Sequence, residues 1–276
     1  MIDTRPPAAD PPPPPARPRR RAVWIVLAAC TALVLVVPAA LEITGRVLTQ
    51  TRETPVVYTR AVTEIRIDAD DARVTFGRGE PGRVRLRERL TWAVDEPKVR
   101  RFWQGTVLWV QVSCEEPSQF FTGLECGADL DFQIPPDVKV MSTSSSGNIV
   151  ARGLPGGIEM HTRSGSLELD DVQGPVVFEG TSGELRGRSL RSREVRAKVG
   201  SGSVNLEFAG EPADVEVRTG SGSIEVTVPA GTHYRTRVRS GSGGQEIDSA
   251  LDDPAAPGRI DLSAGSGSIE MRYPRR

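Results

Sequence analysis

The second half of the chain alternates aliphatic and polar side chains in short stretches, and Ser-Gly pairs separate these stretches. Residues 158–162, 195–199 and 215–219 alternate in this way before a Ser-Gly pair, and residues 167–169 and 204–206 do so after one. A period of two, together with β-branched residues, predicts half-buried strands with aliphatic side chains inward and charged side chains outward. Each Ser-Gly pair is expected to form a corner, because glycine adopts positive φ without steric cost.

The Ser-Gly pairs recur at a nearly constant interval, and an aliphatic residue stands two positions after the glycine in the complete copies. Complete copies contain Gly147, Gly165, Gly183, Gly202, Gly222 and Gly267, and a degenerate copy contains Gly243. The intervals between successive glycines run from 18 to 24 residues. A period of about 20 residues is typical of stacked structural units.

Two all-β architectures accommodate two short strands in each repeat. In a β-solenoid, or β-helix-like domain, equivalent strands of successive repeats pair in register. Their aliphatic residues then form one interior column, namely Ile149, Leu167, Leu185, Val204 and Ile224. In an antiparallel β-meander sandwich, each Ser-Gly pair is instead a hairpin tip. The constant period favours the solenoid over residues 138–273, and the meander is the alternative.

Residues 61–137, which precede the repeats, are rich in aromatic side chains and also alternate as strands do. We predict that they form an aromatic-rich β cap, because an uncovered first repeat would expose apolar core and unpaired backbone groups. The alternative is that Trp103, Phe120 and Phe121 form an interaction surface, since exposed aromatic side chains anchor interfaces.

An uncharged apolar segment, residues 22–41, follows four arginines near the N-terminus. Twenty residues of helix span about 30 Å, which is the thickness of a bilayer core, so we predict one transmembrane signal anchor. The arginines place residues 1–21, a disordered Pro/Arg-rich tail, in the cytoplasm. Residues 42–60 are then a tether to an extracytoplasmic domain. A cleaved signal peptide ending near residues 38–40 and a lipoprotein signal at Cys30 are the alternatives.

The chain has three cysteines, and Cys30 lies in the predicted anchor. Cys114 and Cys126 lie outside the membrane in this topology, where thiols tend to oxidise. We therefore predict a disulfide between Cys114 and Cys126, with two unpaired thiols as the alternative.

The repeat region resembles a known family. The Ser-Gly-x-aliphatic repeats and the segments Ile134–Val138 and Val228–Gly231 are similar to the bacterial "putative adhesin" domains of unknown function, the LiaG-like proteins. The resemblance covers roughly residues 60–273. It implies a β-rich repeat domain outside the membrane, without established catalytic or ligand-binding residues.

Motifs for catalysis, cofactors and metals are missing from the sequence. Gly-Ser-Gly-Ser recurs at Gly200, Gly220 and Gly265, but it lacks the third glycine of a dinucleotide fingerprint. His161 and His233 have no Cys or His companions at zinc-ligand spacing, so both are expected to be surface residues. We predict no catalytic, cofactor or metal residues, and the net charge of −1 argues against a nucleic-acid partner.

The outward arginines offer a basic stripe for anionic wall polymers, although interspersed glutamates favour an ordinary mixed surface. They are Arg152, Arg163, Arg186, Arg188, Arg196, Arg218, Arg235, Arg237 and Arg239. The sequence thus predicts a membrane-anchored, non-catalytic envelope scaffold or adhesin-like interaction module. Its expected partners are the lipid bilayer and either an envelope protein or an anionic wall polymer. The alternatives are a β-helix enzyme acting on cell-wall glycan, favoured by an acidic cluster facing Arg235 or Arg237, and an envelope-stress accessory or sensor protein.

Overall fold

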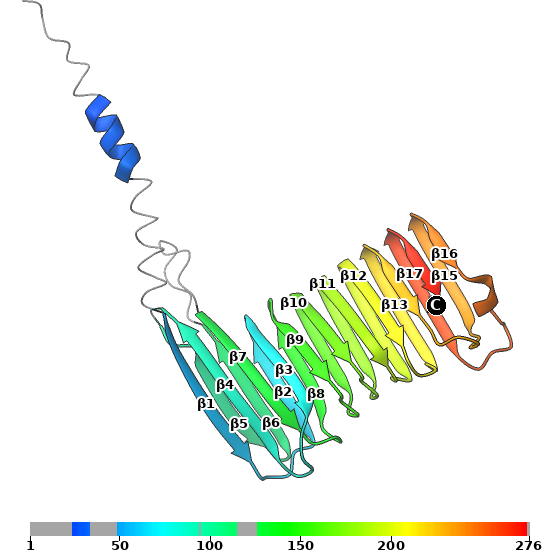
Figure 1. The fold of residues 1–276 in the computed structure, drawn as a ribbon, viewed down its shortest axis with the longest axis horizontal. Coiled ribbons are helices and arrows are strands. Elements are labelled where there is room, and N and C mark those ends of the chain that lie inside the picture. The colour runs from blue at the N-terminus through cyan, green and yellow to red at the C-terminus, as the bar shows by residue number, and fades with distance from the viewer. Residues whose placement is uncertain (1–23, 34–48, 94, 115–125, 275–276) are drawn as a thin grey trace, which may run out of the picture. The chain divides into compact units, whose positions relative to one another are not determined.

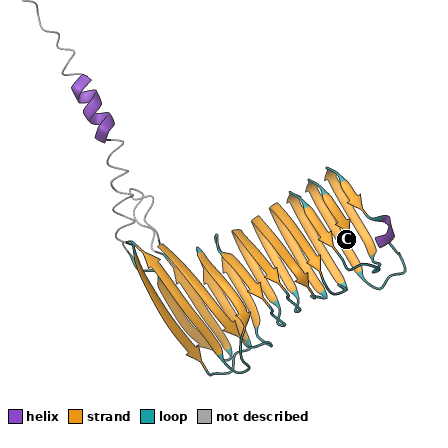
Figure 2. Ribbon diagram, viewed as in Figure 1, coloured by secondary structure: helices purple, strands orange, loops and turns teal. Residues whose placement is uncertain are grey.

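The computed structural model describes residues 24–33, 49–93, 95–114 and 126–274, and Figure 1 draws the fold as a ribbon. The chain divides into two compact units at residue 47. The first unit contributes one described helical stretch, and the second contains the strands coloured orange in Figure 2.

In the first unit, residues 24–33 are helical, and large apolar side chains such as Trp24 and Leu33 are exposed. Within the described part of the chain, no helix combines the length and the apolar character needed to cross a membrane. The predicted anchor, residues 22–41, lies partly outside the described residues, and the predicted tail lies wholly outside them.

The described residues of the second unit form 18 strands of one sheet and a short 3-10 helix. The elements are β1 (Gln50–Tyr58), β2 (Glu64–Ala69), β3 (Ala72–Arg78), β4 (Val84–Trp92), β5 (Lys98–Gln104), β6 (Val107–Ser113), β7 (Cys126–Ile134), β8 (Lys139–Ser144), β9 (Asn148–Arg152), β10 (Ile158–Asp170), β11 (Val176–Leu190), β12 (Glu194–Phe208), β13 (Asp214–Ser221), β14 (Ile224–Thr227), β15 (Arg235–Ser242), β16 (Gln245–Ile247), η1 (Ser249–Leu251), β17 (Arg259–Ser266) and β18 (Ile269–Arg272).

Successive repeats pair in parallel and in register. Leu167 of β10 lies opposite Leu185 of β11, which lies opposite Val204 of β12. Ile149 of β9 and Ile224 of β14 continue the same column, and all five side chains are at most 1% exposed. The predicted interior column is therefore confirmed. Parallel, in-register pairing is the arrangement expected of a solenoid, whereas a meander would pair its strands antiparallel.

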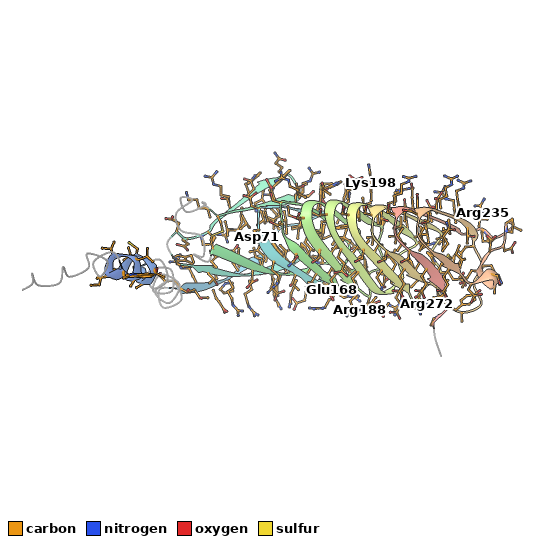
Figure 3. All side chains as sticks on the ribbon, turned by 90° about the horizontal axis from the view of Figure 1, so that it is seen from above. Asp71, Glu168, Arg188, Lys198, Arg235 and Arg272 are labelled. Atoms are coloured by element: carbon orange, nitrogen blue, oxygen red, sulfur yellow. A yellow bond between two sulfur atoms is a disulfide. The ribbon has the colours of Figure 1, made fainter. Side chains whose placement is uncertain are left out.

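Each repeat places one strand before the Ser-Gly corner and one after it, and these strands belong to two facing layers. The first layer contains β5, β6, β2, β8, the N-terminal parts of β10 to β12, β13, β17 and β15. The second contains β1, β4, β7, β3, β9, the C-terminal parts of β10 to β12, β14, β18 and β16. In Figure 3, Lys198 and Arg235 project from the first layer, and Glu168, Arg188 and Arg272 project from the second. Aliphatic side chains fill the space between the layers.

The last two repeats stack in the reverse of their sequence order. Strands β17 and β18 pair directly with β13 and β14, and β15 and β16 form the outermost turn beyond them. The inward positions of β17 and β18 are aliphatic and fully buried, as at Leu262 and Ile269. In β16, Gln245 occupies the position that faces Ile269, and it is exposed. The degenerate repeat therefore closes the stack, because a terminal repeat needs a more polar face than an internal one.

At the opposite end, antiparallel strands terminate the parallel stack. Strands β4 and β5 pair antiparallel with β7 and β6, and β1 pairs antiparallel with β4. Phe76 and Phe132 stack in this region with ring centroids 5.2 Å apart. Residues 50–58, which we expected within the tether, are β1, because their alternation lets Val56 and Tyr58 pack against the core.

A buried ion pair joins the two layers at this end. Arg101 Nη1 of β5 lies 3.0 Å from Glu88 Oε1 of β4, and the Glu88 side chain is only 4% exposed. Burial raises the pKa of the Glu88 carboxyl, and the nearby Arg101 guanidinium opposes that shift. An unpaired carboxylate would be costly at this position.

The predicted disulfide is present. Cys114, which follows β6, and Cys126, which begins β7, are joined with an S–S distance of 2.06 Å. The bond crosses from the first layer to the second, where other repeats have a Ser-Gly corner. Phe120 and Phe121 lie between these cysteines and outside the described residues.

Candidate ligand-binding groove

A groove of about 960 Å³ runs across the outward face of the first layer. It crosses β2, β8, β10, β11, β12, β13 and β17, so its long direction follows the stacking of the repeats. The lining of the groove repeats from strand to strand, because consecutive strands present equivalent outward positions to the same side.

Two columns of outward residues line the groove. Column A consists of Asp68, Thr143, His161, Glu179, Lys198, Arg218 and Ser263. Column B lies two residues further along each strand, next to the corner, and consists of Asp70, Ser145, Arg163, Thr181, Gly200, Gly220 and Gly265. The in-register pairing brings together residues that lie about 20 positions apart in the sequence.

Glycine occupies column B in the later repeats because the strands approach one another closely there. A Cβ atom added at Gly200, Gly220 or Gly265 would lie 2.5 Å from a backbone carbonyl oxygen of the neighbouring strand. Glycine is the residue that permits such an approach of two backbones. The Gly-Ser-Gly-Ser motif therefore has a stacking role, and it leaves a floor without side chains in this part of the groove.

Hydrogen bonds and ion pairs fix the polar side chains in the middle of the groove. His161 Nε2 lies 2.9 Å from Glu159 Oε1, and His161 Nδ1 lies 3.3 Å from Glu179 Oε2. Lys139 Nζ donates a 3.0 Å hydrogen bond to Glu159 Oε2. Hydrogen bonding by His161, and then by Lys139, holds the pKa of the Glu159 carboxyl below its usual value. His161, expected as an ordinary surface residue, is thus a groove residue between two carboxylates.

A second cavity of about 280 Å³ adjoins the groove at its N-terminal end. The two cavities share Asp68 and Asp70, and the second is also lined by Lys98, Arg100 and Gln111. The polar surface therefore continues from the repeats onto β5 and β6. Across the described residues, no group of three or more His, Cys, Asp or Glu side chains is arranged to hold a metal ion.

The repeat region matches a known protein family. The sequence model described as Toastrack DUF4097 matches residues 136–272. Residues 136–272 belong to the Toastrack family. This match confirms the resemblance to the "putative adhesin" domains of unknown function. It also places most of the groove within the Toastrack domain, whereas Asp68 and Asp70 precede the matched residues.

Several solved structures are similar to the chain. A "putative cell adhesion protein" from Clostridium sporogenes is 10% identical, and the match covers 82% of this chain and 100% of that one with a TM-score of 0.37. A "putative adhesin" from Bacteroides fragilis is 11% identical, and the match covers 81% of this chain and 97% of that one with a TM-score of 0.44. No curated protein matches the chain.

Two neighbouring aromatic residues of β5, which precedes the Toastrack domain, lie on opposite faces of that strand. Trp103 packs against the core, edge-on to Tyr58 with ring centroids 5.5 Å apart, and the Arg60 guanidinium lies 5.0 Å from its ring. Phe102, one residue earlier, points to the opposite side and stacks on Trp109 at 5.7 Å. Phe102 is 39% exposed, and no pattern in the sequence distinguishes it from the other aromatic residues of this region.

Most of the outward arginines of the Toastrack domain are paired with carboxylates. Arg188 contacts Glu168 at 3.1 Å, and similar ion pairs involve Arg186, Arg196, Arg218 and Arg237. Arg235 and Arg237 lie outside the groove lining, and Arg237 lies 3.6 Å from Asp261. Asp261 pairs in register with Glu216, so two neighbouring carboxylates lie beside Arg237, and neither of them lines the groove.

Proposed function

We propose that the chain is a non-catalytic, adhesin-like interaction module that is anchored in the cell membrane and presents its Toastrack domain outside the cytoplasm. The observation that carries this proposal is the groove on the first layer. A groove with a fixed backbone floor and ordered polar side chains binds a partner without a large cost of ordering. The partner expected there is an envelope protein or an anionic wall polymer.

Rigidity of the stack supports a binding role for the groove. Columns A and B are attached to strands whose inward residues are buried, such as Val199 next to Lys198 and Thr219 next to Arg218. A site built on strands keeps its geometry more accurately than one built on loops. The groove is therefore suited to an extended ligand that contacts several repeats at once.

Filling the groove should abolish binding. Thr181 is an exposed column B residue, so Thr181→Trp would place an indole in the groove without disturbing the core. The full-length protein in detergent should sediment with cell walls of the bacterium that produces it. We expect the apparent affinity of the Thr181→Trp variant for these walls to fall about tenfold or more.

The matched control is Ser223→Trp, which adds the same side chain to the outward face of the second layer. Ser223 is exposed, and it does not line the groove. This variant should sediment as the unmodified protein does. Equal loss in both variants, or no loss in either, would contradict binding through the groove.

The topology can be tested with amine labelling, because Lys98, Lys139 and Lys198 are the only lysines in the chain. A membrane-impermeant amine reagent added to intact spheroplasts should label these lysines and spare the amino group of Met1, since arginines before an apolar segment stay cytoplasmic. Lysis before labelling should expose the Met1 amine as well. Lysines that react only after lysis would reverse the proposed orientation.

A further inference from the structure

Column A becomes entirely cationic or neutral in the last four turns of the stack. Lys198 lies beside Arg218, Arg218 beside Ser263, and Ser263 beside Arg239 of the outermost turn. We call Lys198, Arg218 and Arg239 the cationic strip. All three side chains are exposed, and Figure 3 shows Lys198 projecting from the first layer. The reversed order of the last two repeats places Ser263 between Arg218 and Arg239.

The charge of the strip is only partly neutralised. Arg218 forms an ion pair with Glu216, which lies two residues earlier on the same strand. Within the described part of the chain, Lys198 and Arg239 form no ion pair, in contrast to arginines of the second layer such as Arg188. Glu179 lies beside Lys198 in register, but no ion pair joins these two described side chains. Exposed cations that are not held in ion pairs raise the local concentration of anions.

Glycines flank the strip on its corner side. Gly200, Gly220, Gly265 and Gly241 form column B over these four turns, and each is needed for close stacking. The strip therefore borders a floor of exposed backbone on which no side chain obstructs a ligand. A folded protein surface would meet this narrow floor poorly, whereas an extended polymer can lie along it.

We propose that the cationic strip and its glycine floor bind a linear anionic glycan that runs along the stack. This proposal rests on the groove being the binding site, as set out under the proposed function, and it identifies the ligand class. Neighbouring strands are about 4.8 Å apart, which is close to the length of one sugar unit in an extended glycan. Carboxylates on two successive sugars can thus meet Lys198 and Arg218, and a carboxylate two sugars further along can meet Arg239. An arginine binds a carboxylate through two parallel hydrogen bonds.

Groups of columns A and B on the N-terminal side of the strip suit the hydroxyl groups of the same polymer. Glu179 accepts hydrogen bonds, and Thr181 both donates and accepts them. These residues continue the groove toward the N-terminal end, so a glycan longer than the strip would still find polar partners. The cationic strip would bind the carboxylates of the glycan, and Glu179 and Thr181 would bind its hydroxyl groups.

The test uses the full-length protein in detergent and fluorescently labelled oligogalacturonate as the probe. We expect saturable binding that weakens as NaCl is raised, because salt screens exposed charges. Lys198→Glu combined with Arg218→Glu should lower the affinity about tenfold or more. The control is Arg152→Glu combined with Arg188→Glu, which makes the same change of net charge on the second layer and should leave the affinity within about twofold.

Several results would overturn the proposal. They are equal losses in the two double variants, equal affinity for uncharged dextran, and binding to phosphatidylglycerol vesicles but not to oligogalacturonate. Unchanged circular dichroism of both double variants would exclude misfolding as the cause of a loss. If reversing the strip has no effect while Thr181→Trp still abolishes cell-wall binding, the ligand class is wrong and the proposed function stands. If neither the charge reversal nor Thr181→Trp affects binding, the proposed ligand class and the proposed function are both wrong.

Discussion

Aspartate in place of Ile224 should destabilise the folded state by on the order of 4 kcal/mol, because it buries a charge that has no partner. Ile224 is 1% exposed and lies between Val204 of β12 and Ile269 of β18, both of which are equally buried. The surrounding side chains are aliphatic and offer no hydrogen bonds. Urea denaturation of the full-length protein, followed by circular dichroism, would measure the loss in the free energy of unfolding.

The matched control is Ser223→Asp, one residue earlier. Ser223 is exposed on the outward face of the second layer, and Ser203 and Ser268 lie beside it in the neighbouring turns. We expect this change to cost less than about 0.5 kcal/mol, because the added charge is exposed to solvent. If both variants lose a similar free energy of unfolding, residues 223 and 224 do not differ in burial, and the interior column is refuted.

The interior column was predictable because it depends on the period alone. Once Ile149, Leu167 and Leu185 recur at one phase, parallel stacking is the arrangement that buries all of them in one row. The corner disulfide was predictable for a similar reason, since Cys114 and Cys126 are the only pair outside the apolar segment.

The order of the last two turns was harder to predict, because strand pairing between distant repeats is a property of the whole stack. The sequence does contain the signal. The degenerate repeat has Thr236 and Gln245 where β17 and β18 have Ile260 and Ile269, and the repeat with the aliphatic residues is the better one to bury between two others. A comparison of inward residues would therefore have assigned the outer position to β15 and β16.

The groove could not be located before the register was known. His161 and Glu179 are 18 residues apart, and only parallel in-register pairing brings them within 3.3 Å. The outward aromatic residue of β5 was hard to identify for a different reason, because neighbouring residues on a strand face opposite sides. Phe102 is outward and Trp103 packs against the core, and the aromatic character of the segment does not distinguish them.

Alanine in place of Gly222 should cost about 3–5 kcal/mol, because the corners leave no room for a side chain. A Cβ atom at this position would lie 1.8 Å from the carbonyl oxygen of Gly202, and Gly222 has φ of 138°. The obstructing atom belongs to the backbone of the next turn, so relief requires the two turns to separate. Separation would break hydrogen bonds on both sides of the corner, since Gly267 stacks on Gly222 in the same way.

Gly244→Ala is the matched control for this change, because Gly244 lies at a corner too, directly after the pair Ser242-Gly243. It has no heavy atom within 4 Å of the added Cβ position, and its φ lies outside the left-handed region. We expect its free energy of unfolding to change by less than about 1 kcal/mol, with the sign set by the lower entropy of the unfolded chain. Thermal unfolding of both variants would compare them directly. If Gly222→Ala is as stable as Gly244→Ala, the turns are not in contact at the corners, and the tight stacking that forms the groove floor is not present in solution.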